Sequence, residues 1–470
     1  MEFSQDDDRN NLSLSKFEDM LKTNHVLFFD SSEFETIIIH YLESGKISLA
    51  KKAIKLGLEQ HPTSTALKLF KVETLIVEDK LDAAEALLNE LYEIEPTNSE
   101  IYIQKASIFS RKDKNEEAIK SLLFALKVCD NEKDMVDIYA LIGMEYLFLD
   151  QFENARSYFM KCLEANIHDY SAMYNIIYCF EHMEQNREAI TFLNNYLNKN
   201  PYCEIGWHQL GIQYVAIKDY KKALTAFDFA IISDDTFIGA YLEKGKILEK
   251  QGFYKKAIEN YEITLALDDP TSFALLRIGR CYEKLEQDDL AIQYYHKAIH
   301  EDPLLDKGWI AITKFHLKNQ NYPKGLYYIN KAINIDSNNV SYWKLYAEIN
   351  HKLNFLEEAE RGYKKTLELG NYELQTWLTR ADILTTLGEF DSALNILNQA
   401  LEFYTETPEI EFRLCGLYFL LGKKEEADFH LKNALKHNPE YISILKKLFP
   451  KVYTNSHIKN IIKIFKTTSD

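Results

Sequence analysis

A small residue recurs at a fixed interval along almost the whole chain of 470 residues. Successive positions are 34 residues apart at every step except one, which spans 37 residues, and they are Ala50, Ala84, Ala118, Ala155, Ala189, Ala223, Ala257, Ala291, Gly325, Ala359, Ala393 and Ala427. A period of this length is typical of arrays of helix–turn–helix units. Because protein interiors are closely packed, a small side chain at one place in successive units indicates that two helices meet there too closely for a larger one. The pattern therefore predicts an all-α solenoid.

The composition agrees with an ordered helical array and disfavours one class of partner. Only 9 prolines and 16 glycines interrupt a chain that is 46% hydrophobic, so there is ample material for a core. The 72 acidic residues outnumber the 55 basic ones and give a formal net charge of −17. Nucleic acid carries charge of the same sign, so we expect no general binding to it.

Cysteine spacing and the lack of long apolar runs bear on the compartment. The six cysteines form no Cys-x-x-Cys pair, which favours buried thiols in a reducing compartment over a disulfide or metal framework. The first residues have neither a basic leader nor an apolar run typical of a secretory signal. No stretch approaches the roughly 18 consecutive apolar residues of a membrane span. We therefore expect a cytoplasmic protein that does not insert into membranes.

Two stretches of the chain share one detailed pattern. In the unit that begins at Glu204, places 4, 7, 8, 11, 17, 20, 24 and 27 hold Trp207, Leu210, Gly211, Tyr214, Tyr220, Ala223, Phe227 and Ala230. The unit that begins at Ser272 matches with Gly279, Tyr282, Ala291, Tyr295, Ala298 and a closing Pro303. This pattern closely resembles the tetratricopeptide repeat. The resemblance implies a right-handed superhelix of antiparallel helix pairs with a long concave groove.

Carried outward, the register predicts twelve repeats over residues 31–441. They start at residues 31, 65, 99, 136, 170, 204, 238, 272, 306, 340, 374 and 408. We interpret residues 1–30 as an acidic N-terminal segment with a short helix, and residues 442–470 as basic C-terminal capping helices. Between the third and fourth repeats, residues 129–135 include three extra residues, which we interpret as a loop.

The C-terminal tail has two readings. Its apolar stripe of Ile458, Ile461, Ile462 and Phe465 has helical spacing and lies beside Lys459, Lys463 and Lys466. A basic amphipathic helix can lie on a membrane surface or bind a partner. We favour a capping helix, because a repeat array must cover its last apolar face.

Catalytic and metal-binding patterns are scarce, and we predict neither an enzyme nor a cofactor. The stretch from Gly239 to Lys246 resembles a phosphate-binding loop but has the wrong glycine spacing and lies inside an expected helix. His296 and His300 stand one helical turn apart and could share a metal. No third ligand is evident nearby in the sequence, so we interpret them as two solvated histidines.

The repeat family lines its groove with places 2, 5, 6, 9, 12 and 13 of each first helix. In the first six repeats the charged residues at these places are mostly acidic, namely Glu35, Glu43, Glu73, Glu100, Arg111, Asp137 and Glu181. In the seventh to tenth they are mostly basic, and the residues that we select as candidates for the groove are Lys246, Arg277, Arg280, Lys307, Lys314 and Lys344. Lys246, Arg280 and Lys314 share place 9 and form a basic ladder. It either contacts an acidic ligand or pairs internally with Glu243, Glu249 and Glu283.

Before the ladder, the groove is predicted to be apolar and aromatic. The candidate residues there are Met144, Phe148, Tyr174, Asn175, Tyr178, His208 and Gln209. Such side chains combine buried area with hydrogen bonds on peptide-binding surfaces. The carboxylate clamp of chaperone adaptors does not fit, because the repeats on either side of Asn175 lack its lysines and asparagine.

We therefore predict a non-enzymatic scaffold that binds a partner protein or peptide, with an acidic segment at the basic ladder. The alternatives are a substrate-recruiting subunit of a larger enzymatic complex and an RNA-binding helical repeat, which the acidic part of the groove disfavours. Gly325 replaces alanine in the ladder and predicts a flexible point, because glycine weakens a helix.

Overall fold

The computed structural model describes residues 3–23, 27–267 and 271–469, and every regular element in these ranges is helical. The chain divides into two compact units, residues 1–233 and 234–470, which are described separately below. Unit 1 contains α1 (Phe3–Thr23), α2 (Ser31–Glu43), α3 (Ile47–Gln60), α4 (Thr65–Val77), α5 (Leu81–Ile94), α6 (Ser99–Arg111), α7 (Asn115–Val128), α8 (Glu132–Phe148), α9 (Phe152–Ala165), α10 (Tyr170–His182), α11 (Asn186–Lys199), α12 (Glu204–Ala216) and α13 (Tyr220–Ser233).

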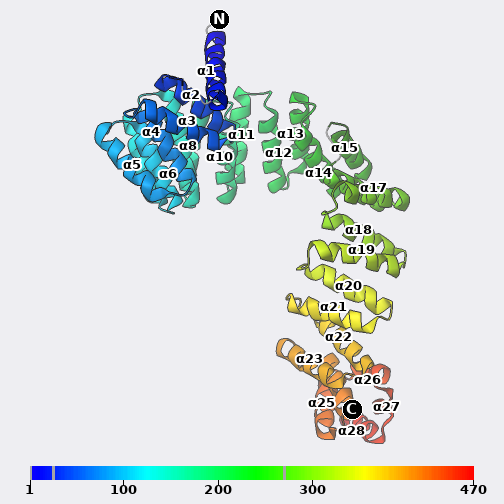
Figure 1. Ribbon diagram of the computed structural model, residues 1–470. Helices are drawn as coiled ribbons and strands as arrows, with labels where there is room; N and C mark the ends of the chain where they lie inside the picture. Colours follow the sequence, from blue (N-terminus) through cyan, green and yellow to red (C-terminus); the bar gives the residue numbers. More distant parts are fainter. Residues whose placement is uncertain (1–2, 24–26, 268–270, 470) are drawn as a thin grey trace. The chain divides into compact units, whose positions relative to one another are not determined.

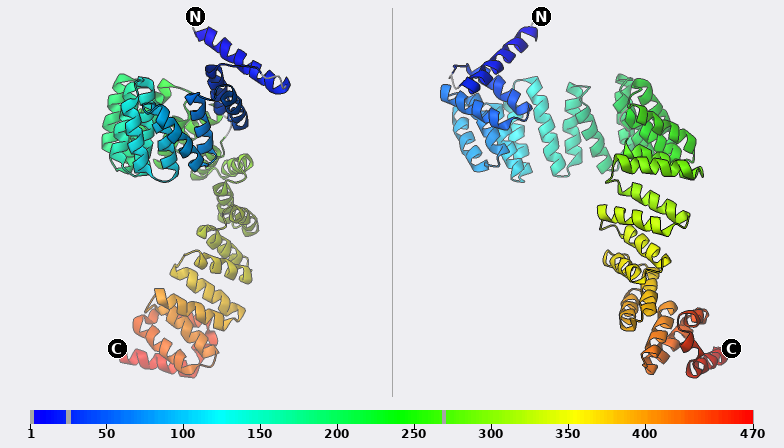
Figure 2. Two further views of the ribbon diagram at one scale, coloured as in Figure 1. Left: turned by 60° about the vertical axis from the view of Figure 1, so that its left-hand side comes forward. Right: turned by 45° about the vertical axis from the view of Figure 1, so that its right-hand side comes forward.

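Unit 2 continues the same alternation, and short helical segments precede its last helix (Figure 1). Its elements are α14 (Ile238–Lys250), α15 (Tyr254–Leu267), α16 (Ser272–Lys284), α17 (Asp288–Glu301), α18 (Asp306–Lys318), α19 (Tyr322–Ile335), α20 (Val340–Lys352), α21 (Leu356–Glu368), α22 (Leu374–Leu387), α23 (Phe390–Phe403), α24 (Pro408–Leu420), α25 (Lys424–His437), the 3₁₀ turn η1 (Pro439–Ile442), α26 (Ser443–Leu448), α27 (Pro450–Thr454) and α28 (Ser456–Ser469). From α18 to α23 the pairs follow one another along a stack (Figure 2). The predicted all-α solenoid of helix pairs is confirmed.

The turn inside each helix pair has one constant feature. From α2/α3 to α24/α25, the residue at place 15 adopts a left-handed conformation with φ between 54° and 84°. These residues are Gly45, Asp79, Asp113, Asp150, Glu184, Lys218, Gly252, Glu286, Gln320, Asn354, Gly388 and Gly422. The left-handed residue ends the first helix and redirects the chain, so the second helix can pack back on the first. Only four of the twelve are glycine, so eight turns hold a side chain in a conformation that L-residues disfavour.

The two helices of a pair pack closely at two places. The alanines of the ladder are fully buried, as Ala223, Ala257 and Ala291 show. A second close approach lies at place 8, where a methyl group on Gly245 would come within 2.5 Å of the Tyr261 ring. The same holds for Gly279 against Tyr295. A small residue in one helix therefore makes room for a large ring or a backbone in the other.

The prediction of a loop at residues 129–135 is wrong for residues 132–135, which are helical. Helix α8 begins at Glu132 and has 17 residues, whereas α6 has 13. The Asn131 side chain caps it by accepting a hydrogen bond of 3.0 Å from the backbone N–H of Lys133. Glu132 and Asp134 add negative charge in the first turn, where the helix dipole favours it. The three extra residues therefore lengthen a helix.

Both ends of the array are covered by helices. The N-terminal helix α1 has 21 residues and is longer than the short helix expected; it buries Phe17 and Met20 against the first pair. At the other end, Ile458 and Ile462 of α28 lie in the core formed with α24 and α25. The apolar stripe of the tail is therefore occupied by packing. Glu2 and Asp470 lie outside the described residues, and the side chain of Lys466 is likewise not described.

None of the helices described in the structure is long and apolar enough to cross a membrane.

Candidate functional site

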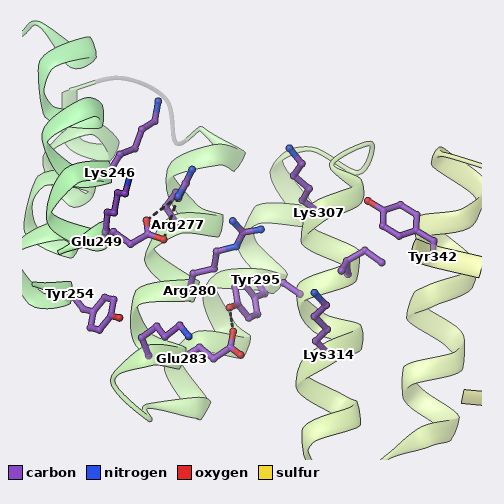
Figure 3. A pocket seen from close by; sticks show the side chains of 14 residues that line it. Lys246, Glu249, Tyr254, Arg277, Arg280, Glu283, Tyr295, Lys307, Lys314 and Tyr342 are labelled. Atoms are coloured by element: carbon purple, nitrogen blue, oxygen red, sulfur yellow. Dashed lines mark hydrogen bonds and ion pairs between the residues drawn. The ribbon is translucent and has the colours of Figure 1, made fainter. Parts of the chain in front are cut away.

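The first helices of the pairs in unit 2 enclose an open cavity of about 700 Å³. Helices α14, α16, α18 and α20 each supply lining residues (Figure 3). Seven of these residues are basic, namely Lys246, Lys250, Arg277, Arg280, Lys284, Lys307 and Lys314. Two are acidic, Glu249 and Glu283, and three are tyrosines, Tyr254, Tyr295 and Tyr342. A chain with a formal charge of −17 thus concentrates positive charge in one cavity.

The structure brings the predicted basic ladder together. Lys246, Arg280 and Lys314 all line the cavity, as do Arg277 and Lys307. The 34-residue period places them on successive first helices, so side chains far apart in the sequence share one space. The predicted Lys344 is not among the lining residues. Its ammonium lies 2.5 Å from a carboxylate oxygen of Glu373, so that charge is compensated.

The internal pairing that was one alternative for this region is present for two of the predicted cations. Lys246 Nζ lies 2.6 Å from Glu243 Oε1, and Arg277 Nη1 lies 3.1 Å from Glu249 Oε2. Each of these cations therefore has an internal partner.

The other three cations of the predicted set are not compensated in this way. Within the residues that the structure describes, the side chains of Arg280, Lys307 and Lys314 form no hydrogen bond and no ion pair. In Figure 3 the Arg280 guanidinium is directed from α16 towards the helix that carries Lys307 and Lys314. A planar guanidinium and two ammonium groups that line one cavity suit the binding of carboxylate or phosphate oxygens.

The two acidic residues of the cavity are engaged by buried tyrosines. The Tyr261 hydroxyl donates to Glu249 Oε2 at 3.1 Å, and the Tyr295 hydroxyl donates to Glu283 Oε2 at 2.5 Å. Burial, together with the neighbouring carboxylate, raises the pKa of both tyrosines, so the hydroxyls stay protonated and keep donating. Glu249 is also held by Arg277. Both carboxylates thus have donors of their own, which leaves Arg280, Lys307 and Lys314 available to a ligand.

Some of the predicted apolar and aromatic groove residues of unit 1 line a cavity, and others are exposed outside it. Met144 and Phe148 line a second cavity of about 430 Å³ and are 38% and 62% exposed. Tyr174 and Tyr178 on α10 are exposed but do not line this cavity, and Asn175 between them is half-buried.

The two candidates on α12 are less accessible than expected. His208 is half-buried, with its ring 5.7 Å from that of Phe227. Gln209 is only 8% exposed, so its assignment to an open groove surface is wrong. Neighbouring helices cover this side chain, and a groove place in the repeat register does not by itself ensure access to solvent.

Sequence reasoning missed several lining residues. Lys250 and Lys284 are not among the candidates from the sequence, yet both line the basic cavity. They follow Lys246 and Arg280 by four residues, which puts them on the same helix faces. This spacing in the sequence could have identified them. The sequence also gives no sign that Glu145 in unit 1 is buried. Whether a side chain at a given place of the repeat is buried depends on the helix pairs that pack against it.

His296 and His300 are both exposed to solvent, as the sequence predicts. Among the residues described, no group of three histidine, cysteine or acidic side chains is arranged to hold a metal ion.

Comparison with known proteins gives matches to one repeat family. Family models described as "Tetratricopeptide repeat" match residues 136–166 and 374–406, and residues 242–305. Anaphase-promoting complex subunit 3 of Schizosaccharomyces pombe is 26% identical over 162 residues, which are 34% of this chain and 24% of that protein. Anaphase-promoting complex subunit 7 of Dictyostelium discoideum is 35% identical over 85 residues, which are 18% of this chain and 14% of that protein. The matches therefore span a quarter or less of these relatives.

The comparison with solved structures also gives matches. The APC/C hetero-tetramer Cut9–Hcn1 is matched over 95% of both chains at 13% identity with a TM-score of 0.36. A crystal structure of MamA protein is matched over 36% of this chain and 92% of that one, at 24% identity with a TM-score of 0.32.

Proposed function

Because this chain is a tetratricopeptide repeat protein, we propose that it is a non-catalytic scaffold whose basic cavity in unit 2 binds an acidic segment of a partner protein. Arrays of this kind present extended surfaces to other chains. The observation that carries the proposal is the set of Arg280, Lys307 and Lys314, whose charges line one cavity without an ion pair among the described residues.

The chemistry of the cavity favours an extended acidic peptide. Cations on successive first helices can meet several carboxylates along one segment. Tyr254 and Tyr342 add aromatic surface to the lining. Several charge contacts along one segment add up, although each is weak where the cavity is open to solvent. The binding should weaken steeply as salt is added, because the long-range part of the attraction is screened.

The test is a titration of the full chain with a fluorescein-labelled acidic probe, a ten-residue peptide of alternating glutamate and leucine, followed by anisotropy. The double variant Arg280→Glu, Lys314→Glu should bind at least about ten-fold more weakly, since two favourable charge contacts become repulsive. The matched control is Lys331→Glu, Lys364→Glu, which makes the same change in net charge at exposed positions outside the cavity. Equal affinities of the double variant and the control would refute the assignment of this cavity.

The two similar curated proteins favour a second role, as a subunit of a larger complex. Both curated proteins matched are named as subunits of the anaphase-promoting complex. We propose that this chain likewise acts as a subunit of a larger enzymatic complex and recruits a protein to it. In size-exclusion chromatography of native extract, the tagged chain should elute far above its own 55.0 kDa. Elution at the mass of the free chain, from fresh extract at low salt, would contradict this role.

A further inference from the structure

Unit 1 contains a cavity of opposite character to the basic one. It has a volume of about 430 Å³ and lies along the first helices α4, α6 and α8. Its apolar lining includes Val77, Leu141, Met144 and Phe148, which are 52%, 41%, 38% and 62% exposed. Four large apolar side chains exposed around one cavity form a contiguous patch of the kind that marks a binding surface.

A buried carboxylate lies in the wall of this cavity. Glu145 on α8 is only 8% exposed, and its Oε2 atom has no hydrogen-bond partner among the described residues. Burial raises the pKa of Glu145, and a hydrogen bond from Ser110 offsets part of that effect. A buried polar atom without a partner is costly, and native structures satisfy nearly all such atoms. Oε2 is therefore an acceptor that a bound ligand can complete.

A second carboxylate lines the same cavity. Glu73 on α4 is half-buried, and burial together with the charge of Glu100 raises its pKa. One cation, Arg111, also lines the cavity; it is exposed at the C-terminal end of α6, where the helix dipole favours a positive charge. Arg111 forms no ion pair with either carboxylate among the described residues. Neither carboxyl group of the cavity therefore has an ion-pair partner among the described residues.

We propose that this cavity is a second binding site, which takes an apolar segment of a partner protein and accepts a hydrogen bond from a lysine or arginine of that segment at Glu145. The apolar side chains of the segment cover Met144 and Phe148, and Glu73 adds to the attraction for the cation. This site has a charge preference opposite to that of the basic cavity, and its chemistry does not depend on the function proposed for unit 2.

The first test is a selection from a random library of ten-residue peptides displayed on phage. The bait is the full chain with Arg280→Gln and Lys314→Gln, so that acidic sequences are not drawn to unit 2 and no carboxylate is added there. The selected peptides should combine apolar residues with lysine or arginine. In the same bait with Glu145→Gln the enrichment of basic residues should disappear, whereas Glu90→Gln, an exposed acid outside the cavity, should leave it unchanged.

The second test measures affinity directly with the most enriched peptide and with its twin that has norleucine in place of the basic residue. The wild-type chain should prefer the basic peptide by about ten- to a hundred-fold, the range for a hydrogen bond to a charged group. Glu145→Gln should abolish that preference, and Phe148→Ser should weaken both peptides. Circular dichroism of each variant establishes that it is folded.

Several outcomes would overturn the inference. These are a library that yields no binder, a selection without basic enrichment, and a preference that survives Glu145→Gln. The titration of the basic cavity with the acidic probe should be unaffected by Glu145→Gln, so the two proposals can fail independently.

Discussion

Gly279 lies so close to the Tyr295 ring that the structure predicts whether an alanine at this position stabilises or destabilises the fold. A methyl group added at Gly279 would lie 2.5 Å from the Tyr295 ring and 3.2 Å from the backbone oxygen of Ala291. The ring is fully buried and its hydroxyl is bonded to Glu283, so neither neighbour can move away freely. Overpacking of this kind costs about 1–3 kcal/mol, against a gain of about 1 kcal/mol for alanine over glycine in a helix.

Gly325 provides the matched comparison. It is also a buried helical glycine, but its nearest neighbours would be the ends of two flexible side chains, Leu317 at 3.0 Å and Ile349 at 3.8 Å. These can shift, so most of the gain in helix propensity of about 1 kcal/mol should be realised. We therefore expect Gly279→Ala to destabilise unit 2 by about 1 kcal/mol and Gly325→Ala to stabilise it by up to about 1 kcal/mol.

The assay is thermal unfolding followed by circular dichroism, combined with hydrogen exchange. For a unit of this size each 1 kcal/mol corresponds to about 2–4 °C in Tm. Because neighbouring repeats in an array can unfold separately, exchange in α16 and α17 should rise in Gly279→Ala, and exchange in α19 should fall in Gly325→Ala. Shifts of the same sign in both variants would refute the steric reasoning, and unchanged exchange in α19 would count against a flexible point at Gly325.

Two further predictions concern local chemistry. Lys218 has φ of 62° in the turn between α12 and α13, so Lys218→Gly should relieve backbone strain and raise stability by about 0.5–1 kcal/mol in urea unfolding; a lower midpoint would contradict this. Burial, together with the nearby charge of Glu249, raises the pKa of Cys281 to about 12. Iodoacetamide at pH 8 should therefore leave Cys281 unmodified in the folded chain and modify it in urea. Mass spectrometry of the peptide that contains Cys281 measures the labelling. Comparable labelling in both states would show that the thiol is accessible.

Much of the fold could be predicted because the information lies in short segments. The helical spacing of apolar residues and the recurrence of Ala223, Ala257 and Ala291 indicate helices that meet closely, whatever the rest of the chain does. The basic ladder was found by the same means, since residues one period apart occupy equivalent places. Residues 129–135 show the limit of this reasoning, because the cap at Asn131 turned expected loop residues into helix.

The repeat pattern alone predicts helix pairs, and it predicts that positive charge recurs on the first helices of the seventh to ninth repeats. Which of these charges form ion pairs depends on how neighbouring helix pairs pack. Arg277 meets Glu249 from a neighbouring pair, 28 residues away, while Arg280 forms no ion pair among the described residues. Glu145 is buried and Phe148 is exposed although they are three residues apart on one helix. Periodicity specifies a place on a helix, whereas burial and ion pairing depend on which neighbouring side chains pack against that place.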